Sequence, residues 1–122
     1  MDKSQLRKQL QDSQREIADL LRLLKQRPSL IRGSVYPLRR KCGKATCRCQ
    51  EGHLHESWVL SVPDEGRKRM RAVPKGKRLK WQQMTDRYRR YRRARARLVK
   101  LFSEILKQVD ELERERTVPP PP

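Results

Sequence analysis

Three cysteines and a histidine lie close together in the sequence, as Cys42, Cys47, Cys49 and His55. Three thiolates and an imidazole can complete a tetrahedral zinc site, with bonds of about 2.3 Å to sulfur and about 2.0 Å to nitrogen. Basic residues surround the cysteines and favour the thiolate form, which is the form that binds metal. We therefore predict that these four residues form a closed, structural zinc site. Their spacing, C-x4-C-x-C, differs from the paired C-x2-C of a zinc ribbon.

Other interpretations of the same residues remain open. His53 lies two residues before His55 and is a second candidate for the fourth ligand. Two of the cysteines could instead act as a redox pair, or all three could be reduced thiols in a basic loop, although such a loop offers little apolar cover. His53 could also act as a general base beside a zinc ion that keeps an open position.

The second chemical signal is a concentration of positive charge. The chain of 122 residues has a formal net charge of +18, and residues 67–100 hold 16 basic residues against one acid, Asp86. Arginine forms paired hydrogen bonds with phosphate, whereas a merely solvated helix face usually mixes both signs of charge. The segment thus predicts contacts with the phosphates of DNA or RNA. The predicted contacts are Arg67, Lys68, Arg69, Arg71, Lys75, Lys77, Arg78, Lys80, Arg87, Arg89, Arg90, Arg93 and Arg97.

Two tyrosines, Tyr88 and Tyr91, lie among these arginines. Their rings could stack on nucleic-acid bases, but both positions also fit the apolar seam of a helix, which favours packing within the protein. A membrane surface suits the segment less well, because its apolar face is narrow.

Two helices are expected to position these groups. Residues 1–27 contain no Gly or Pro, and residues 75–116 form a second, Arg-rich helix before a disordered proline tail at 117–122. Both helices show heptad patterns, broken only at Ser13 and at Arg95. The first seam consists of Leu6, Leu10, Ile17, Leu20 and Leu24, and the second of Met84, Tyr88, Tyr91, Leu98, Phe102, Ile105, Val109 and Leu112.

Residues 28–74, between the helices, are expected to form a zinc knot and a β-hairpin. Segments rich in β-forming residues at 30–38, 57–62 and 68–73 are separated by turn signals, of which 63–66 is the strongest. So small a sheet needs a metal or a helix to stabilise it. The predicted fold class is α+β, mostly α. Two long antiparallel helices form a helical hairpin or coiled coil, with a zinc-stapled antiparallel β-knot at the bend.

The second helix is longer than the first, so its end beyond Phe102 would leave apolar seam positions facing water. We predict that a second copy of the chain, or another coiled-coil protein, covers these positions.

The segment that carries the cysteines resembles a group of short uncharacterised prokaryotic proteins, whose genes often lie beside transposases and other mobile-element genes. The shared features are R-R-K-C-G-K at 39–44, C-R-C at 47–49, a histidine before an aromatic strand, and a long basic helix. In that group Gly-Pro and an aromatic residue follow the histidine. Here Glu56-Ser57-Trp58 follows His55, which makes His55 a better match than His53. The resemblance covers residues 30–112 and implies a mobile-element or DNA-processing context, with no established activity.

Composition narrows the class of protein. With 34% hydrophobic and 5% aromatic residues, the chain lacks material for the thick core into which an enzyme pocket is cut, and no grouping of residues indicates catalysis. An odd number of cysteines argues against a secreted disulfide scaffold, and no apolar run approaches the ~18 residues of a membrane span. We predict a cytoplasmic protein that is not an enzyme and has no small-molecule substrate. It is either a nucleic-acid-binding accessory protein or a coiled-coil adaptor for an acidic protein partner.

Overall fold

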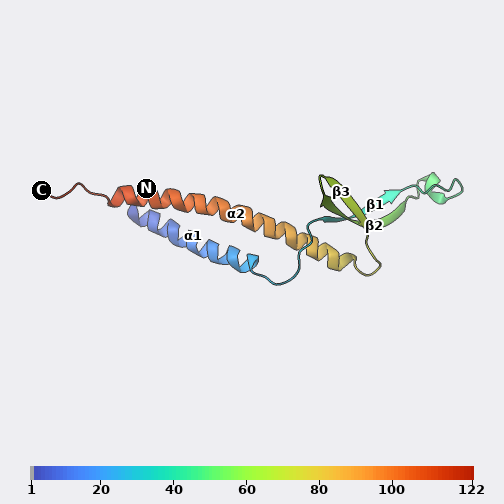
Figure 1. The fold of residues 1–122 in the computed structure, drawn as a ribbon, viewed down its shortest axis with the longest axis horizontal. Coiled ribbons are helices and arrows are strands. Elements are labelled where there is room, and N and C mark those ends of the chain that lie inside the picture. The colour runs from blue at the N-terminus through green and yellow to red at the C-terminus, as the bar shows by residue number, and fades with distance from the viewer. Residues whose placement is uncertain (1) are drawn as a thin grey trace. The chain divides into compact units, whose positions relative to one another are not determined.

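The computed structural model describes residues 2–122 of the protein. Two helices, three strands and one short 3₁₀ helix follow one another along the chain (Figure 1). They are α1 (Lys3–Leu24), β1 (Ser34–Arg40), η1 (Arg48–Glu51), β2 (His55–Asp64), β3 (Arg67–Ala72) and α2 (Arg78–Arg116). The predicted α+β class, with two helices and an antiparallel sheet, is confirmed. The chain forms two compact units, one of residues 1–27 with 91–122 and one of residues 28–90, and each is described by itself.

The start of α1 is fixed by a capping box. The Asp2 carboxylate accepts a hydrogen bond of 2.8 Å from the backbone N–H of Gln5, whose side-chain oxygen accepts one of 3.3 Å from the Asp2 N–H. These bonds satisfy backbone donors that have no partner inside the helix. Over the described residues, neither helix has an apolar stretch long enough to cross a membrane.

In the helical unit, α1 runs beside the C-terminal part of α2 (Figure 1). On α1 the most buried side chains are Leu6 and Ser13, which both belong to the predicted heptad face. Ser13, the residue that interrupts the predicted apolar seam of α1, is therefore a small buried side chain where the helix packs closely. Gln108 donates a hydrogen bond of 3.2 Å to Gln9, and Arg97 pairs with Glu16 further along α1, so the contacts follow opposite directions on the two helices.

On α2 the buried face differs from the predicted one beside Arg95 and Phe102. Leu98, Ile105 and Leu112 are half-buried, as their seven-residue spacing suggests. The alternate buried positions are Ala94 and Leu101, each one residue before a predicted seam position. The buried face contains Ala94 and Leu101 in place of Arg95 and Phe102, because small and aliphatic side chains pack more closely between two helices than an arginine or a phenyl ring. With Ala94 in the seam, the seam is not interrupted at Arg95.

An ion pair lies at the edge of this buried face. The Arg97 guanidinium donates hydrogen bonds to both carboxylate oxygens of Glu16, one of them 2.8 Å long, and it also reaches Glu104 at 3.4 Å. The hydrogen bond from Arg97 lowers the pKa of Glu16 below its usual value. A lowered carboxyl pKa stabilises the folded chain above the ordinary pKa of Glu, and this contribution is lost as the pH falls through the folded value.

The shifted register predicts a difference between two adjacent residues. Leu101 is 1% exposed and Phe102 is 50% exposed. Leu101→Ala is therefore expected to lower the free energy of unfolding by about 2–5 kcal/mol, because it leaves a cavity in the seam. Phe102→Ala is expected to cost less than about 1 kcal/mol. Urea denaturation at submicromolar chain concentration measures both, and equal losses would contradict the register.

The sheet has the order β1-β2-β3 and both pairings are antiparallel. The turn between β2 and β3 has positive φ at both central residues, 47° at Glu65 and 80° at Gly66, which is the type I′ geometry of tight hairpins. The predicted turn at 63–66 is thus shorter, and Pro63 lies in the strand. Pro63 is tolerated there because β1 ends its pairing at Ser61, leaving no strand on that side of Pro63.

The sheet unit also contains the first part of α2. The Ile31 N–H donates to the Met84 carbonyl at 3.1 Å, and Arg87 donates to the Ser29 carbonyl at 2.8 Å. The guanidinium of Arg78 lies 3.7 Å from the ring centroid of Trp58, a cation–π contact. These contacts join the segment before β1, and Trp58 of β2, to the N-terminal part of α2.

Candidate metal centre

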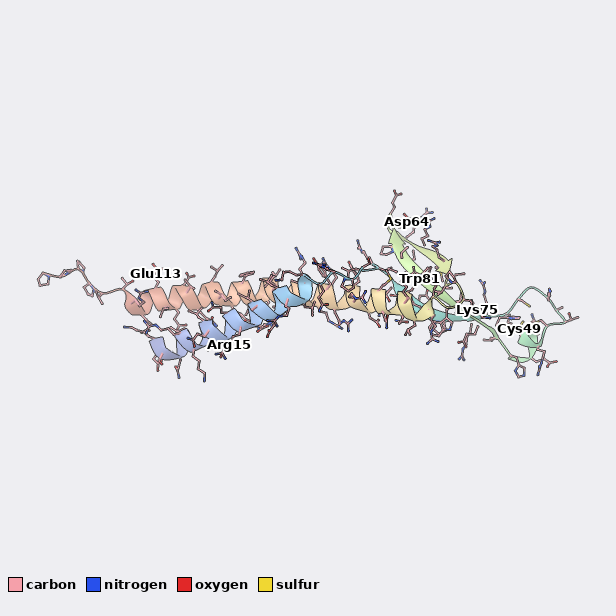
Figure 2. The ribbon with its side chains drawn as sticks, turned by 90° about the horizontal axis from the view of Figure 1, so that it is seen from below. Arg15, Cys49, Asp64, Lys75, Trp81 and Glu113 are labelled. Atoms are coloured by element: carbon pink, nitrogen blue, oxygen red, sulfur yellow. The ribbon has the colours of Figure 1, made fainter. Side chains whose placement is uncertain are left out.

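The three cysteines lie in the loop of residues 41–54 that connects β1 to β2, and Figure 2 labels Cys49 there. Cys42 comes two residues after the end of β1, Cys47 caps the short helix η1, and Cys49 lies within η1. His55 is the first residue of β2 and pairs with Arg40, the last residue of β1. The strand register therefore brings both ends of the loop together.

The four side chains converge on one point. The sulfur atoms of Cys42 and Cys49 are 3.5 Å apart, and the sulfur of Cys47 is 3.1 Å from His55 Nε2. All four ligand atoms lie within 4.8 Å of one another. A tetrahedral site with zinc bond lengths has ligand–ligand edges of roughly 3.5–3.8 Å. The cluster can thus hold a metal ion, and its histidine is His55, the residue named from the sequence, with His53 outside the group.

Hydrogen bonds within the loop hold the cysteines in place. The Cys42 N–H donates to the Cys49 sulfur at 3.3 Å, which is a common way to orient a thiolate ligand. The Gln50 amide donates to the Cys42 carbonyl at 3.3 Å and joins the two sides of the loop. Gly52, with φ of 97°, ends η1 in a left-handed conformation that favours glycine. The sequence analysis did not identify Gln50 or Gly52, because neither belongs to a ligand pattern.

The cysteines differ in their tendency to ionise. Hydrogen bonds, chiefly from the Cys49 backbone and then from His55, lower the pKa of Cys47 to about 6. Burial raises the pKa of Cys49. Cys47 is therefore a thiolate at neutral pH without a metal, whereas a cation at the site would be needed to ionise the buried Cys49.

The predicted phosphate contacts are placed in several environments. Arg87 and Arg97 are half-buried and bonded to protein groups, and Arg89 pairs with Asp86 at 3.3 Å and with the Ser34 hydroxyl at 2.8 Å. Arg78 lies against Trp58. The remaining predicted contacts are exposed and take part in no ion pair among the described residues: Arg67, Lys68, Arg69, Arg71, Lys75, Lys77, Lys80, Arg90 and Arg93.

Strand β3 carries the densest group of these free cations. It is an edge strand and is exposed along its whole length. The register with β2 places Arg67, Arg69 and Arg71 on one face of the sheet and Lys68 on the other. Strand β3 is thus a positively charged edge of the sheet.

Comparison with known proteins gives one match. Neither a curated protein nor a solved structure matches the chain. The model of a protein family described as a domain of unknown function (DUF6788) matches residues 4–84. This range includes α1 from its second residue onward, the whole sheet and the four residues of the metal cluster, and it is more than half of the chain. The chain therefore belongs to the DUF6788 family.

Proposed function

We propose that the protein is a zinc-stabilised nucleic-acid-binding module, acting as an accessory factor in DNA or RNA processing. Zinc is the metal that best fits three sulfurs and one imidazole nitrogen in a closed tetrahedral set. All four ligand positions come from the protein, so the zinc is structural and leaves no open position for a reacting water. Its role is to close the loop of residues 41–54 and so support the adjoining ends of β1 and β2.

The observation that supports nucleic acid as the partner is the exposed cationic edge of the sheet. Strand β3 presents Arg67, Lys68, Arg69 and Arg71 to solvent without a carboxylate partner among the described residues. Like charges this close repel one another, and a bound polyanion would relieve that repulsion. Arginine also forms bidentate bonds to phosphate, and backbone-directed contacts of this kind are independent of sequence.

An adaptor that binds an acidic protein surface is the second candidate. The uncovered apolar side chains of α2 favour some protein partner, but they lie in the helical unit and not on β3. Nucleic acid accounts better for the cationic strand, because a phosphate chain presents regularly spaced negative charge. A partner protein on α2 and a nucleic acid on β3 are compatible.

Fluorescence anisotropy with labelled duplex DNA and duplex RNA of random sequence tests the proposal. Binding that weakens steeply with added salt supports nucleic acid as the partner. If neither polymer binds at 50 mM salt and the protein instead captures an acidic protein, the adaptor function replaces nucleic-acid binding as the proposed function.

A further inference from the structure

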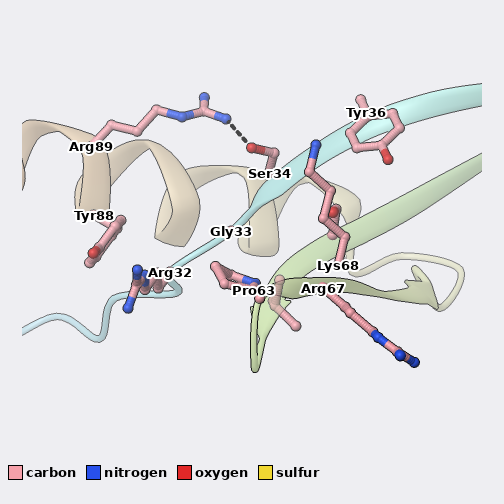
Figure 3. A pocket seen from close by; sticks show the side chains of 12 residues that line it. Arg32, Gly33, Ser34, Tyr36, Pro63, Arg67, Lys68, Tyr88 and Arg89 are labelled. Carbon is pink, nitrogen blue, oxygen red and sulfur yellow. Dashed lines mark hydrogen bonds between the residues drawn. The ribbon is translucent and has the colours of Figure 1, made fainter.

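A hollow of about 660 Å³ lies beside the sheet in the unit of residues 28–90 (Figure 3). It is formed by the segment that enters β1, by the hairpin end of β2 and β3, and by one turn of α2. None of its twelve lining residues is acidic. The hollow therefore suits an anionic or a neutral ligand.

The walls of the hollow combine two kinds of side chain. Arg32, Lys68 and Arg89 are exposed cations at its rim, and the half-buried rings of Tyr36 and Tyr88 come from different elements, β1 and α2. Figure 3 shows the Arg89 guanidinium bonded to the Ser34 hydroxyl at the start of β1. Lys68 and Arg89 are among the phosphate contacts predicted from the sequence, whereas Arg32 precedes β1 and lies outside the basic segment 67–100.

The Tyr36 hydroxyl of β1 has only a weak bond to exchange for a ligand. It donates to the Met70 sulfur at 4.0 Å, and a thioether is a weak acceptor. A double helix cannot use such a hollow, because its bases are stacked inside the duplex. An unpaired base offers a flat face to tyrosine and a polar edge to the hydroxyl, and its phosphate is an anion that the cations of the hollow can bind.

We propose that this hollow binds one unpaired nucleotide of a single strand, with its base against a tyrosine ring and its phosphate among Arg32, Lys68 and Arg89. The inference rests on the proposed function and adds to it a preference for single-stranded over duplex nucleic acid. Duplex contacts do not use the hollow, whereas single-strand contacts use both the β3 edge and the hollow.

The test uses the full chain and an oligonucleotide that contains 2-aminopurine, a base whose fluorescence falls when it stacks. The wild-type protein is expected to quench this probe in single-stranded DNA. Tyr36→Leu combined with Tyr88→Leu is expected to abolish the quenching and to weaken single-strand binding by about 5- to 150-fold, with duplex affinity unchanged. The corresponding Phe variants keep the rings and are expected to retain quenching, and Tyr91→Leu, outside the hollow, serves as the control.

Equal single-strand affinity in the wild type and the double Leu variant, or the same loss on single strands and duplex, overturns the nucleotide site and leaves the proposed function standing. No binding to any nucleic acid overturns both. Circular dichroism shows whether the variant has folded. If the Leu variant is unfolded, the Phe pair and wild-type quenching decide the question alone.

A different observation concerns the helical unit. Val99, Phe102, Leu106 and Val109 are 59%, 50%, 62% and 44% exposed. Their steps of three, four and three residues place them on one stripe of α2, next to the face that packs on α1. A strip of large apolar side chains at heptad spacing is the surface from which two helices assemble.

The charges at the two ends of this stripe have opposite signs. Continuing the heptad spacing leads to Arg95 before Val99 and to Glu113 after Val109, and both are exposed. A parallel pair of identical stripes would bring arginine onto arginine and glutamate onto glutamate. An antiparallel pair, centred on Glu104, brings Arg95 of one copy onto Glu113 of the other.

We infer that the stripe binds the same stripe of a second copy, antiparallel and with two-fold symmetry. Sedimentation of the full chain at 10–100 μM tests this. Leu106→Lys is expected to give a monomer, and Lys100→Glu, an exposed position on the opposite side of α2 from the stripe, is expected to leave the dimer intact.

Charge reversal tests the orientation of the pair. Arg95→Glu and Glu113→Arg are each expected to weaken the dimer severalfold, and the double variant is expected to restore it. A monomeric wild type at 100 μM overturns self-association. A dimer that tolerates both single reversals overturns the antiparallel orientation. Neither result bears on nucleic-acid binding by the sheet unit.

Discussion

Replacing Cys49 by serine is expected to weaken zinc binding by roughly 100- to 1000-fold. Structural zinc contributes about 10–16 kcal/mol in zinc-finger peptides, so one of four ligands accounts for roughly 2.5–4 kcal/mol. Cys49 is the most buried of the four residues and its sulfur also accepts the Cys42 N–H. Serine keeps a hydrogen-bond acceptor there but removes the thiolate.

The measurement combines metal analysis with hydrogen exchange. The wild-type protein, purified without chelator, is expected to contain about one zinc per chain. Removing the metal is expected to speed amide exchange most strongly in residues 41–54, and to leave α1 and most of α2 protected, because these have a packed seam of their own. His53→Ala is the matched control and keeps the zinc, since His53 lies outside the cluster. Much less than half an equivalent of metal in untreated protein would contradict the zinc site.

The metal cluster could be predicted from sequence because its members are close along the chain. Cys42, Cys47 and Cys49 share one loop, so their types and spacing restrict the geometry without knowledge of the fold. Two histidines fit the spacing, and only the resemblance favoured His55. In the structure His55 pairs with Arg40 at the end of β1 and its Nε2 lies 3.1 Å from the Cys47 sulfur, and strand register is a non-local property.

The seam of α2 shows where sequence reasoning stops. Leu98, Ile105 and Leu112 recur every seven residues and were assigned correctly to the buried side. Two apolar choices existed for the alternate positions, Leu101 or Phe102, and a pattern search prefers the larger ring. The helix carries two adjacent apolar stripes, and only the position of α1 decides which one is buried. Whether the two helices form a coiled coil with a partner stays a prediction.

The hollow beside the sheet could not be predicted at all. Arg32, Lys68 and Tyr88 come from three elements that are far apart in the sequence, and nothing in their spacing links them. The basic character of strand β3, in contrast, was evident from the sequence, because four of residues 67–71 are basic and they follow a strong turn signal.

Reversing three charges on β3 is expected to lower duplex affinity by roughly 100- to 1000-fold at 0.1 M salt. The variant changes Arg67, Arg69 and Arg71 to Glu. Each neutralised phosphate contributes a slope of about −0.9 to the dependence of log K on log salt. At 0.1 M salt, one log unit below 1 M, each contact therefore raises log K by about 0.9 relative to its value at 1 M. Three contacts therefore account for a slope difference of about 2.7 and for the stated loss. The sheet is expected to stay folded, because all three side chains are exposed.

A second variant separates a local surface from overall charge. Lys3, Arg7 and Lys8 are exposed on α1, and changing all three to Glu alters the net charge by the same amount. This control is expected to lower affinity only a little, through long-range attraction that salt screens over about 10 Å at 0.1 M. If both variants lose affinity equally, the protein binds polyanions through net charge alone and β3 is not a defined interface. If the β3 variant binds as tightly as the wild type with an unchanged slope, the phosphates lie elsewhere. Only a loss confined to β3, with a shallower salt dependence, places the nucleic-acid backbone along this strand.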